Sequence, residues 1–419
     1  MVSATMQMRR RLAPVLVTAS LACAGTLSSD GVGTSGGSTQ ATGTTGGGTA
    51  SSVGSTAGSA ADLGPTGTTG GACVEPGQLA YGDPVFLGVG GSPQGVAVGD
   101  VDGDGFVDVL ATSETKKAVY TWFGMGDGPF GPPEIFDFGV VSTGPTALEA
   151  AAIAGDGILD IVYATGVADT LWVRRGNGDG TFGQPAFSGA NEGPFLLADV
   201  DEDGIFDLVA TSGTNLRVRP GKADESFGDP VDSDVVVTVE RLAVADLDGD
   251  GHLDVVGQAE NTVVAALGTG MGTFGPPAMV QVDGAALGVA AGDLSADGIP
   301  DVAAAVAANV ADSGALFVLD GDGAGGFGAP KAVTVQPNPQ GVVIADLDAD
   351  GYDDLVTAHR EGEIGVRRAR GDGTLEPVQI HACHQNPRQL RVADLNGDCV
   401  QDLVVVSPTA GDVCVVLSM

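Results

Sequence analysis

An aspartate-rich segment of nine residues recurs seven times in this chain of 419 residues, and its side chains are suited to binding a metal ion. The first copy is Asp100-Val-Asp102-Gly-Asp104-Gly105-Phe-Val-Asp108. The other copies start at residues 152, 199, 246, 293, 346 and 394, so the intervals between starts are 52, 47, 47, 47, 53 and 48 residues. Such regular spacing is typical of a repeat protein.

The segment carries carboxylates at positions 1, 3, 5 and 9, and position 6 is glycine in six of the seven copies. Alternate side chains of a short loop converge on one point, and glycine permits the sharp turn that this requires. The carbonyl of position 7 and water would complete the six to eight oxygens that Ca²⁺ accepts, whereas Mg²⁺ demands stricter geometry. Soft metals are disfavoured because no histidine or cysteine side chain stands at a ligand position. We therefore expect calcium.

Four copies have the full set of carboxylates, and in these the residue at position 7 contributes only its carbonyl oxygen. Their predicted ligands are Asp100, Asp102, Asp104, Phe106 and Asp108; Asp199, Asp201, Asp203, Ile205 and Asp207; Asp246, Asp248, Asp250, His252 and Asp254; and Asp346, Asp348, Asp350, Tyr352 and Asp354. Without a cation, four close carboxylates would repel one another strongly, which argues against simple solvated turns.

Three copies depart from the pattern. Two remain candidate sites, with predicted ligands Asp293, Ser295, Asp297, Ile299 and Asp301, and Asp394, Asn396, Asp398, Val400 and Asp402. The last of these copies has Cys399 in place of the glycine. The copy at residue 152 keeps Asp156, Gly157 and Asp160 but has Ala152 and Ala154 at positions 1 and 3, so we expect no ion there. The whole chain is thus expected to bind four to six calcium ions.

The formal net charge is −36, from 54 acidic and 18 basic residues. Nucleic-acid-binding proteins carry a basic footprint, so this balance excludes nucleic acid as a partner. It also argues against attraction to anionic membrane surfaces. Much of the negative charge lies in the acidic segments, where bound divalent ions would offset part of it.

Residues 1–22 have the layout of a secretory signal, because Arg9-Arg10-Arg11 precedes a short apolar run that ends at small residues. Ser20-Leu21-Ala22-Cys23 resembles the cleavage box of bacterial lipoproteins, although Ser20 stands where leucine is usual. Simple secretion is the alternative. We expect an extracytoplasmic location, either the bacterial cell surface through a lipid anchor at Cys23 or free secretion. Residues 23–77, rich in Gly, Ser and Thr, are expected to form a disordered tether.

Residues 78–419 contain short, β-branched runs bounded by Gly, Asp and Pro, which predict strands. An apolar run such as Leu242 to Ala245 precedes each acidic loop and is expected to be the innermost strand. Only the stretch Val302 to Val310 leaves helix and strand open. Four strands per unit of about 48 residues predict a β-propeller blade, and the length accommodates seven blades. A parallel β-helix is the alternative, but its repeats are far shorter.

A second motif follows the acidic loop at a fixed distance. It occurs as Phe182-Gly183-Gln184-Pro185, Phe227-Gly228-Asp229-Pro230, Phe274-Gly275-Pro276-Pro277 and Phe327-Gly328-Ala329-Pro330. With these motifs, nearly all of residues 78–419 resembles the FG-GAP (VCBS-type) repeat family, whose best-known members are the seven-bladed propeller heads of integrin alpha chains. The resemblance implies that each acidic loop joins the first two strands of a blade and binds calcium.

The ends of the repeat region predict how the ring closes. The run Val85 to Val89 matches the last strand of a blade, whereas the chain stops after Val413 to Leu417, which matches the third strand. We therefore expect an all-β, seven-bladed propeller of four-stranded blades in which the N-terminal strand completes the C-terminal blade. This arrangement would also protect the exposed strand edges.

The cysteines support this closure. Apart from Cys23, they are Cys73, Cys383, Cys399 and Cys414, all in the closing blade or at its border. Four cysteines allow three pairings in an exported protein. Strands that alternate in direction place Cys73 and Cys399 at the metal-loop end and the other two at the opposite end. This favours the pairs Cys73–Cys399 and Cys383–Cys414.

No catalytic set of residues stands out, since the four histidines (His252, His359, His381 and His384) show no metal-binding spacing. We expect a non-catalytic binding or adhesion module for a protein or a glycan. The alternatives are a lectin, for which Trp122 and Trp172 are available for stacking on sugars, and a polysaccharide lyase or hydrolase with an unrecognised site. The adhesion tripeptide Arg370-Gly371-Asp372 occupies the place of an ordinary Gly-rich turn, so we interpret it as a coincidence.

Overall fold

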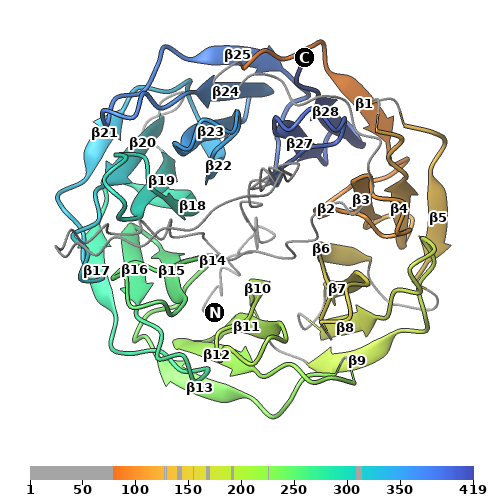
Figure 1. Ribbon diagram of the computed structural model, residues 1–419, viewed down its shortest axis with the longest axis horizontal. Helices are drawn as coiled ribbons and strands as arrows, with labels where there is room; N and C mark the ends of the chain where they lie inside the picture. The colour runs from red at the N-terminus through yellow and green to blue at the C-terminus, as the bar shows by residue number, and fades with distance from the viewer. Residues whose placement is uncertain are drawn as a thin grey trace, which may run out of the picture.

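The computed structural model describes residues 79–419, except 127, 129, 139–143, 154, 167–169, 190–192, 225 and 308–313. In this part of the chain, 28 strands form seven four-stranded antiparallel sheets arranged in a ring (Figure 1). The predicted all-β, seven-bladed propeller is confirmed. No helix among the described residues is long and apolar enough to cross a membrane. The predicted signal (1–22) and tether (23–77) lie outside the described residues.

In the first six blades, the strands follow one another along the chain from the centre of the ring outwards. Blade 1 has β2 (Val96–Gly99), β3 (Asp108–Ser113), β4 (Ala118–Trp122) and β5 (Glu134–Asp137). Blade 2 has β6 (Pro145–Ala151), β7 (Asp160–Thr165), β8 (Thr170–Arg174) and β9 (Ala186–Gly189). Blade 3 has β10 (Phe195–Ala198), β11 (Asp207–Ser212), β12 (Asn215–Arg219) and β13 (Val231–Asp234). Blade 4 has β14 (Arg241–Ala245), β15 (Asp254–Ala259), β16 (Thr262–Ala266) and β17 (Ala278–Gln281).

The last three blades complete the ring. Blade 5 has β18 (Ala285–Gly292), β19 (Asp301–Ala307), β20 (Gly314–Leu319) and β21 (Lys331–Val333). Blade 6 has β22 (Pro339–Ala345), β23 (Asp354–His359), β24 (Glu363–Arg367) and β25 (Gln379–Ala382). Blade 7 has β26 (Leu390–Ala393), β27 (Asp402–Ser407) and β28 (Asp412–Val416), and its fourth strand is β1 (Val85–Gly88).

The hydrophobic core lies between neighbouring blades rather than within any one of them. One buried cluster, for example, combines Ala97 and Leu110 of blade 1 with Leu148 and Ile161 of blade 2. The apolar, β-branched inner strands are buried on both faces for this reason, whereas the outermost strands such as β17 are only partly buried. A single blade cannot bury its apolar faces alone, so the fold depends on the complete ring.

The alanine-rich stretch that left helix and strand open in the sequence is a strand. Ala303, Ala304 and Ala305 of β19 are fully buried, and small side chains suit a strand that is packed between two sheets. Blades 5 and 6 approach closely here, since a methyl group added at Gly288 of β18 would lie 3.4 Å from the Cα of Gly341 in β22. Residues 308–310 of the stretch lie outside the described part.

The ring closes as predicted, with β1 beside β28 (Figure 1). The two strands are antiparallel, and their register pairs Val85 with Val415 and Leu87 with Val413. The pairing continues towards the chain ends, where the N–H of Gly82 donates to the carbonyl of Leu417 at 2.8 Å. The first described residues and the last residues of the chain are therefore held in one blade.

One of the two predicted disulfides is present. Cys383, directly after β25 of blade 6, is bonded to Cys414 on β28 of blade 7. The bond therefore connects blade 6 to the blade that closes the ring. Cys399 is disulfide-bonded as well. Its predicted partner, Cys73, lies outside the described residues, so that pairing stays a prediction.

Candidate metal centres

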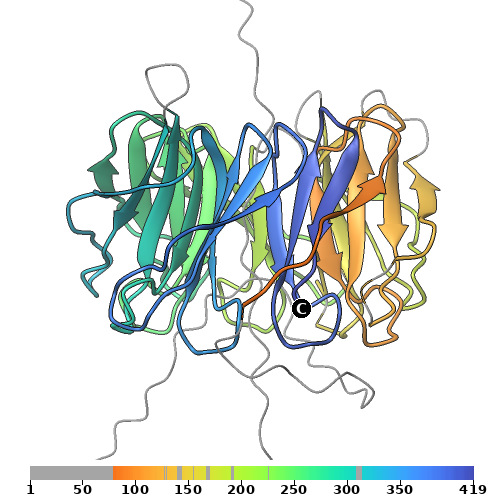
Figure 2. The ribbon, with the colours of Figure 1, turned by 90° about the horizontal axis from the view of Figure 1, so that it is seen from above.

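The seven acidic loops lie at the same end of the ring. Each of them joins the innermost strand of a blade to the second strand, as the loop between β2 and β3 does. In Figure 2 this is the end at which the C-terminus lies. The placement that the family resemblance implied is confirmed, and one face of the molecule carries most of the clustered carboxylates.

Hydrogen bonds within the loop fix its shape. In the first copy, Oδ1 of Asp100 accepts a bond from the N–H of Gly103 at 2.7 Å, and Oδ2 accepts one from Gly105 at 2.9 Å. Oδ1 of Asp104 accepts the N–H of Phe106 at 2.9 Å. These local bonds compete with regular secondary structure and hold the chain in consecutive turns. The turns thereby hold the carboxylates of positions 1 and 3 close to each other without a bound ion.

The loop requires a left-handed backbone at position 4 as well as at position 6. The glycine at position 6 was expected, and Gly105 has φ of +90°. Position 4 also has positive φ in all seven copies, although it is glycine in only four of them. Its occupants are Gly103, Gly155, Glu202, Gly249, Ala296, Ala349 and Gly397. The sequence did not predict this conformation, because three copies have a non-glycine residue at position 4, where positive φ is energetically costly.

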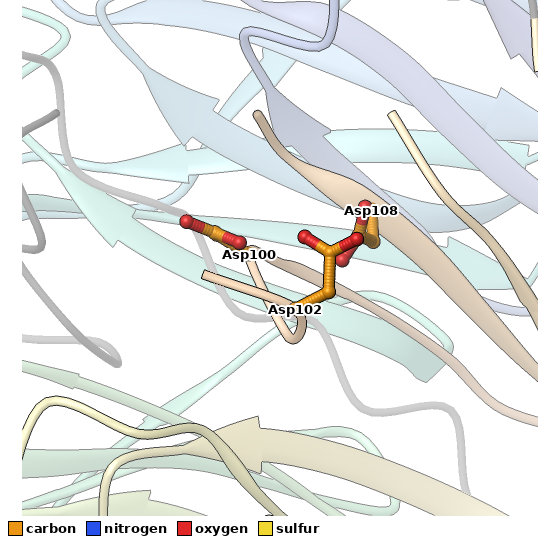
Figure 3. Close-up of side chains that lie close together, drawn as sticks. All are labelled: Asp100, Asp102 and Asp108. Carbon is orange, nitrogen blue, oxygen red and sulfur yellow. The ribbon is translucent and has the colours of Figure 1, made fainter. Parts of the chain in front are cut away.

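The carboxylates of the four full loops gather closely enough to share one ion. Figure 3 shows those of Asp100, Asp102 and Asp108 side by side. In each full loop, three candidate ligand oxygens lie within 4.8 Å of one another. The groups are Asp100, Asp102 and Asp108; Asp199, Asp201 and Asp203; Asp246, Asp248 and Asp250; and Asp346, Asp348 and Asp354. An all-oxygen set of this kind suits a hard cation such as Ca²⁺.

The electrostatics of position 3 also fit a cation. Burial and the neighbouring charges of Asp104 and Asp100 raise the pKa of Asp102 above its ordinary value. The pKa values of Asp201 and Asp248 are raised by burial and by the corresponding neighbours. Each loop thus holds negative charges that destabilise one another, and a divalent cation between them would remove that cost.

Position 9 has a structural role that the sequence did not reveal. One oxygen of Asp108 accepts the N–H of Val101 and the other accepts that of Gly124, both at 2.8 Å. The aspartate therefore ties its own loop to the end of the third strand. All seven copies repeat the bond to the end of the third strand, through Asp108, Asp160, Asp207, Asp254, Asp301, Asp354 and Asp402. The N–H of position 2 donates to the second oxygen in six copies, and the N–H of Ser295 at position 3 does so in the copy at 293. This explains why the degenerate copy has lost positions 1 and 3 but retains Asp160.

We expect that replacing Asp160 by alanine destabilises the protein even without calcium. The change removes the acceptors for Ile153 N–H at 3.2 Å and Gly176 N–H at 2.8 Å, and both of these groups are buried. Bonds to a charged acceptor contribute about 1.5–3 kcal/mol each, so the free energy of unfolding in EDTA should fall by about 3 kcal/mol or more. The exposed Asp156→Ala in the same loop is the control, and equal effects in the two variants would contradict the structural role.

Burial raises the pKa of the position-9 aspartates strongly. The values are about 6 for Asp207, Asp254 and Asp301, about 7 for Asp108 and Asp402, and about 8 for Asp354. The two N–H donors favour the charged carboxylate but only partly offset the cost of removing it from water. A calcium ion close by would restore the charged form.

The thermal midpoint in EDTA should therefore rise when the pH is lowered from 8 to about 5.5. An unfolded aspartate titrates near 3.9, so the folded protein binds more protons in this window, and its stability is lost as the pH rises through the folded pKa values. Saturating calcium should remove this trend, because the ion competes with protons for the same carboxylates. Differential scanning calorimetry in both buffers measures the effect. A midpoint in EDTA that falls with falling pH would refute the prediction.

The two altered loops keep the same backbone but lack a close cluster of three carboxylates among the described residues. The N–H of Cys399, with φ of +69°, donates to Asp394 at 2.8 Å as a glycine would. Hydrogen-bond donors face the carboxylates of this loop, since the Ser418 hydroxyl lies 2.6 Å from Asp402 and 3.0 Å from Asp398. In the other loop, the Ser295 hydroxyl lies 3.5 Å from Asp293.

The copy at residue 152 supplies no metal-binding cluster among the described residues. Ala152 is buried and offers no ligand, while Ala154 lies outside the described part. Asp156 is exposed and accepts the N–H of Ile158 at 2.9 Å.

The tripeptide Arg370-Gly371-Asp372 has a structural explanation. Gly371 has φ of +65°, and the ring of Tyr352 occupies the space that a Cβ would need there. The carboxylate of Asp372 accepts the N–H and hydroxyl of Thr374 at 3.0 and 2.5 Å. Asp179 and Thr181 make the same bonds in blade 2. The tripeptide is thus one of the repeated turns, as interpreted from the sequence.

The histidines and tryptophans make contacts of different kinds. His359 is buried and contacts Thr357, His384 contacts Asp412 at 2.6 Å, and the His252 ring contacts Glu202 of the neighbouring loop. Trp122 is 2% exposed, so its expected availability for stacking on a sugar is wrong. It stacks on Tyr120 instead. Trp172 is partly buried against Phe187.

Comparisons with known proteins agree with this architecture. The FG-GAP-like repeat profile matches residues 100–163, 153–210, 199–257, 246–304 and 346–405, more than half of the chain. An Agrocybe aegerita lectin, solved for its recognition of non-reducing terminal N-acetylglucosamine, is 18% identical with a TM-score of 0.50, over 79% of this chain and 87% of the lectin. BBS1N, solved in complex with ARL6DN, is 11% identical with a TM-score of 0.57, over 81% and 96% of the two chains. A search of the curated proteins finds no significant match. At these identities the two solved structures show likeness of fold alone.

Proposed function

The chain belongs to the FG-GAP-like repeat family, and on that premise we propose that it is a calcium-binding, extracytoplasmic module that binds a protein or a glycan without catalysis. The observation that carries the proposal is the ring of carboxylate clusters on one face of a closed propeller. The four full loops would each hold calcium through the carboxylates of positions 1, 3, 5 and 9 and the carbonyl of position 7. The loops at 293 and 394 are weaker candidates.

The role of calcium in this proposal is structural. A bound ion would neutralise the mutual repulsion within each loop and stiffen the turns that position 9 ties to the third strand. Since all the loops lie at one end of the ring, the ions would also fix the shape of that face. A rigid face binds a partner with a smaller loss of conformational entropy.

Extracytoplasmic location is supported by the Cys383–Cys414 disulfide, because such bonds persist in oxidising compartments. The predicted signal at 1–22, with lipidation of Cys23 or simple cleavage as alternatives, agrees with it. A tether at 23–77 would place the propeller away from a membrane. Neither nucleic acid nor the bare lipid surface is a proposed partner of so acidic a chain.

A glycan is favoured as one kind of ligand by the likeness to the lectin propeller, although fold alone does not transfer a sugar site. Trp172 and Phe187 of blade 2 form a T-shaped pair, and the Phe187 side chain is 62% exposed. An exposed aromatic ring of this kind is suited to packing on a sugar face.

The test is binding of residues 72–419 to a glycan array and to extracellular proteins in calcium and in EDTA, together with turnover assays on polysaccharides. We expect calcium-dependent binding without product release, and loss of binding in a variant with Asp102, Asp201 and Asp248 changed to asparagine. Asp224 has the same turn role in blade 3 as Asp179 and Asp372, since it accepts the N–H and hydroxyl of Ser226. The turn variant with Asp179, Asp224 and Asp372 changed to asparagine is the matched control for lost charge. Release of sugar products would replace the proposal with the lyase or hydrolase alternative.

A further inference from the structure

One of the four full loops already contains a cation supplied by the chain itself. Arg368, directly after β24, lies beside loop 346–354. Its Nε is 2.5 Å from Oδ2 of Asp348, and Nη2 is 3.2 Å from Oδ2 of Asp350. The Asp348 side chain is fully buried, so this ion pair is shielded from water. The contact with Asp348 is an ion pair without hydrogen-bond geometry, whereas the contact with Asp350 is a charge-assisted hydrogen bond.

The corresponding residues of other blades point elsewhere. They precede the residue whose N–H binds the position-9 aspartate, and in blades 1, 2 and 4 they face a turn of the next blade. Phe123 lies against Gly180, and Leu267 lies against Gly325. Arg175 of blade 2 donates to the carbonyl of Asp224 in blade 3 at 3.4 Å. A turn between the third and fourth strands of the following blade therefore normally receives this side chain.

Among the described residues, blade 7 has no continuous connection between its third and fourth strands that could receive Arg368. Its fourth strand is β1, which comes from the other end of the repeat region, so β28 is not connected to it. Tyr81 is close to loop 346–354 instead, and its hydroxyl donates to the carbonyl of Gln401 at 2.9 Å. The N–H of Gln401 in turn donates to the carbonyl of Leu347 at 2.7 Å. Closure of the ring thus changes the surroundings of this loop alone among the four.

The result is a loop that is more enclosed than its counterparts. Asp348 is 1% exposed, whereas the equivalent Asp102, Asp201 and Asp248 are partly exposed. An incoming ion would have to reach a covered carboxylate that already has a positive partner. It would also lie close to the positive charge of the guanidinium. Two positive charges close together and poorly hydrated repel each other strongly.

We propose that Arg368 is the internal counter-ion of loop 346–354, so that calcium fills the loops starting at residues 100, 199 and 246 before this one. The inference rests on the proposed calcium binding and states which full loop is filled last. It also divides the four full loops into two groups. The loops of blades 1, 3 and 4 depend on an external ion, whereas in blade 6 the guanidinium of Arg368 offsets part of the negative charge of the loop.

The test is ion counting by native mass spectrometry during a calcium titration of residues 72–419. At the concentration where the wild type holds three ions, Arg368→Gln should hold four, with the half-saturating calcium concentration of the fourth ion lowered about tenfold or more. Arg175→Gln, the same change at the equivalent position beside the degenerate loop, should hold three. Adding Asp346→Asn to Arg368→Gln should return the count to three, which assigns the extra ion to this loop.

A second readout needs no calcium. In EDTA, Arg368→Gln should lower the thermal midpoint by several degrees, because Asp348 loses its buried partner, while Arg175→Gln should leave it unchanged. Identical ion counts and titration midpoints for Arg368→Gln and the wild type would overturn the filling order. An unchanged EDTA midpoint in Arg368→Gln would overturn the counter-ion. Failure of the proposed calcium function is distinct from both, since the wild type would then hold no ion in any loop.

Discussion

Addition of millimolar calcium to the EDTA-treated propeller is expected to raise its thermal midpoint by about 10 °C or more. An ion that binds only the folded protein stabilises it by about 2.7 kcal/mol at 100 times its dissociation constant, so three filled loops would contribute about 8 kcal/mol. The physical source is the removal of repulsion among the clustered carboxylates of loops 100, 199 and 246. Calorimetry in EDTA, magnesium and calcium measures the shift.

Magnesium at the same concentration is the first control and should give a much smaller shift, because it demands near-octahedral geometry and gives up its water reluctantly. The variant with Asp102, Asp201 and Asp248 changed to asparagine should lose most of the calcium shift. The turn variant at Asp179, Asp224 and Asp372 should keep it, although both variants lose three charges. A midpoint that does not respond to calcium would reject metal binding and leave the acidic loops as purely structural turns.

The second large effect is expected at the closing strand, where Leu87→Asp should prevent stable closure of the ring. Leu87 is 6% exposed and belongs to a cluster that includes Val413 and Val415 of β28. A charge at this position would have to be buried without a partner, which costs several kcal/mol. Detachment of β1 would expose an apolar strand edge on β28, a known route to aggregation.

Size-exclusion chromatography and limited proteolysis at Gly82–Gly88 would detect the opened ring. Val85→Asp is the matched control, since Val85 lies two residues earlier on the same face of the strand but is 37% exposed. It should remain monomeric and resistant to protease. A Leu87→Asp protein that melts cooperatively near the wild-type midpoint would show that β1 contributes little to closure.

The sequence was sufficient for those features that depend on local pattern. The recurrence of the Asp100 segment predicted the number of blades, and the run Val85 to Val89 predicted the strand that closes the ring, observed as Val85–Gly88. The Cys383–Cys414 bond followed from the alternation of strand directions. Each of these depends on spacing along one blade or on the order of strands, and both can be read from the amino-acid sequence.

Features that depend on neighbouring blades were not accessible in this way. Arg368 and Arg175 occupy equivalent positions but contact different groups, because the neighbouring part of the next blade differs. The local sequence pattern does not predict this difference. The structural role of Asp160 could be predicted only if the position of the Gly176 N–H beside its carboxylate were known. The burial of Trp122 likewise follows from contacts with the closing blade. The left-handed backbone at position 4 was not predicted because Glu202, Ala296 and Ala349 are residue types that rarely adopt positive φ.

The pairing of β1 with β28 has a mechanical consequence. Without the predicted Cys73–Cys399 bond, a pull on the chain before Leu79, opposed by a ligand held on the body of the propeller, would load β1 along its own axis. With that bond formed, a pull on the tether would pass to blade 7 through Cys399 first. Backbone hydrogen bonds between antiparallel strands run perpendicular to the axis of β1, so the pairs from Val85–Val415 to Gly88–Asp412 would be sheared together rather than peeled apart in turn. Because the Cys383–Cys414 bond fastens β28 to blade 6, the strand that bears the load is itself covalently braced. The point at which the ring is joined is thereby built to resist tension.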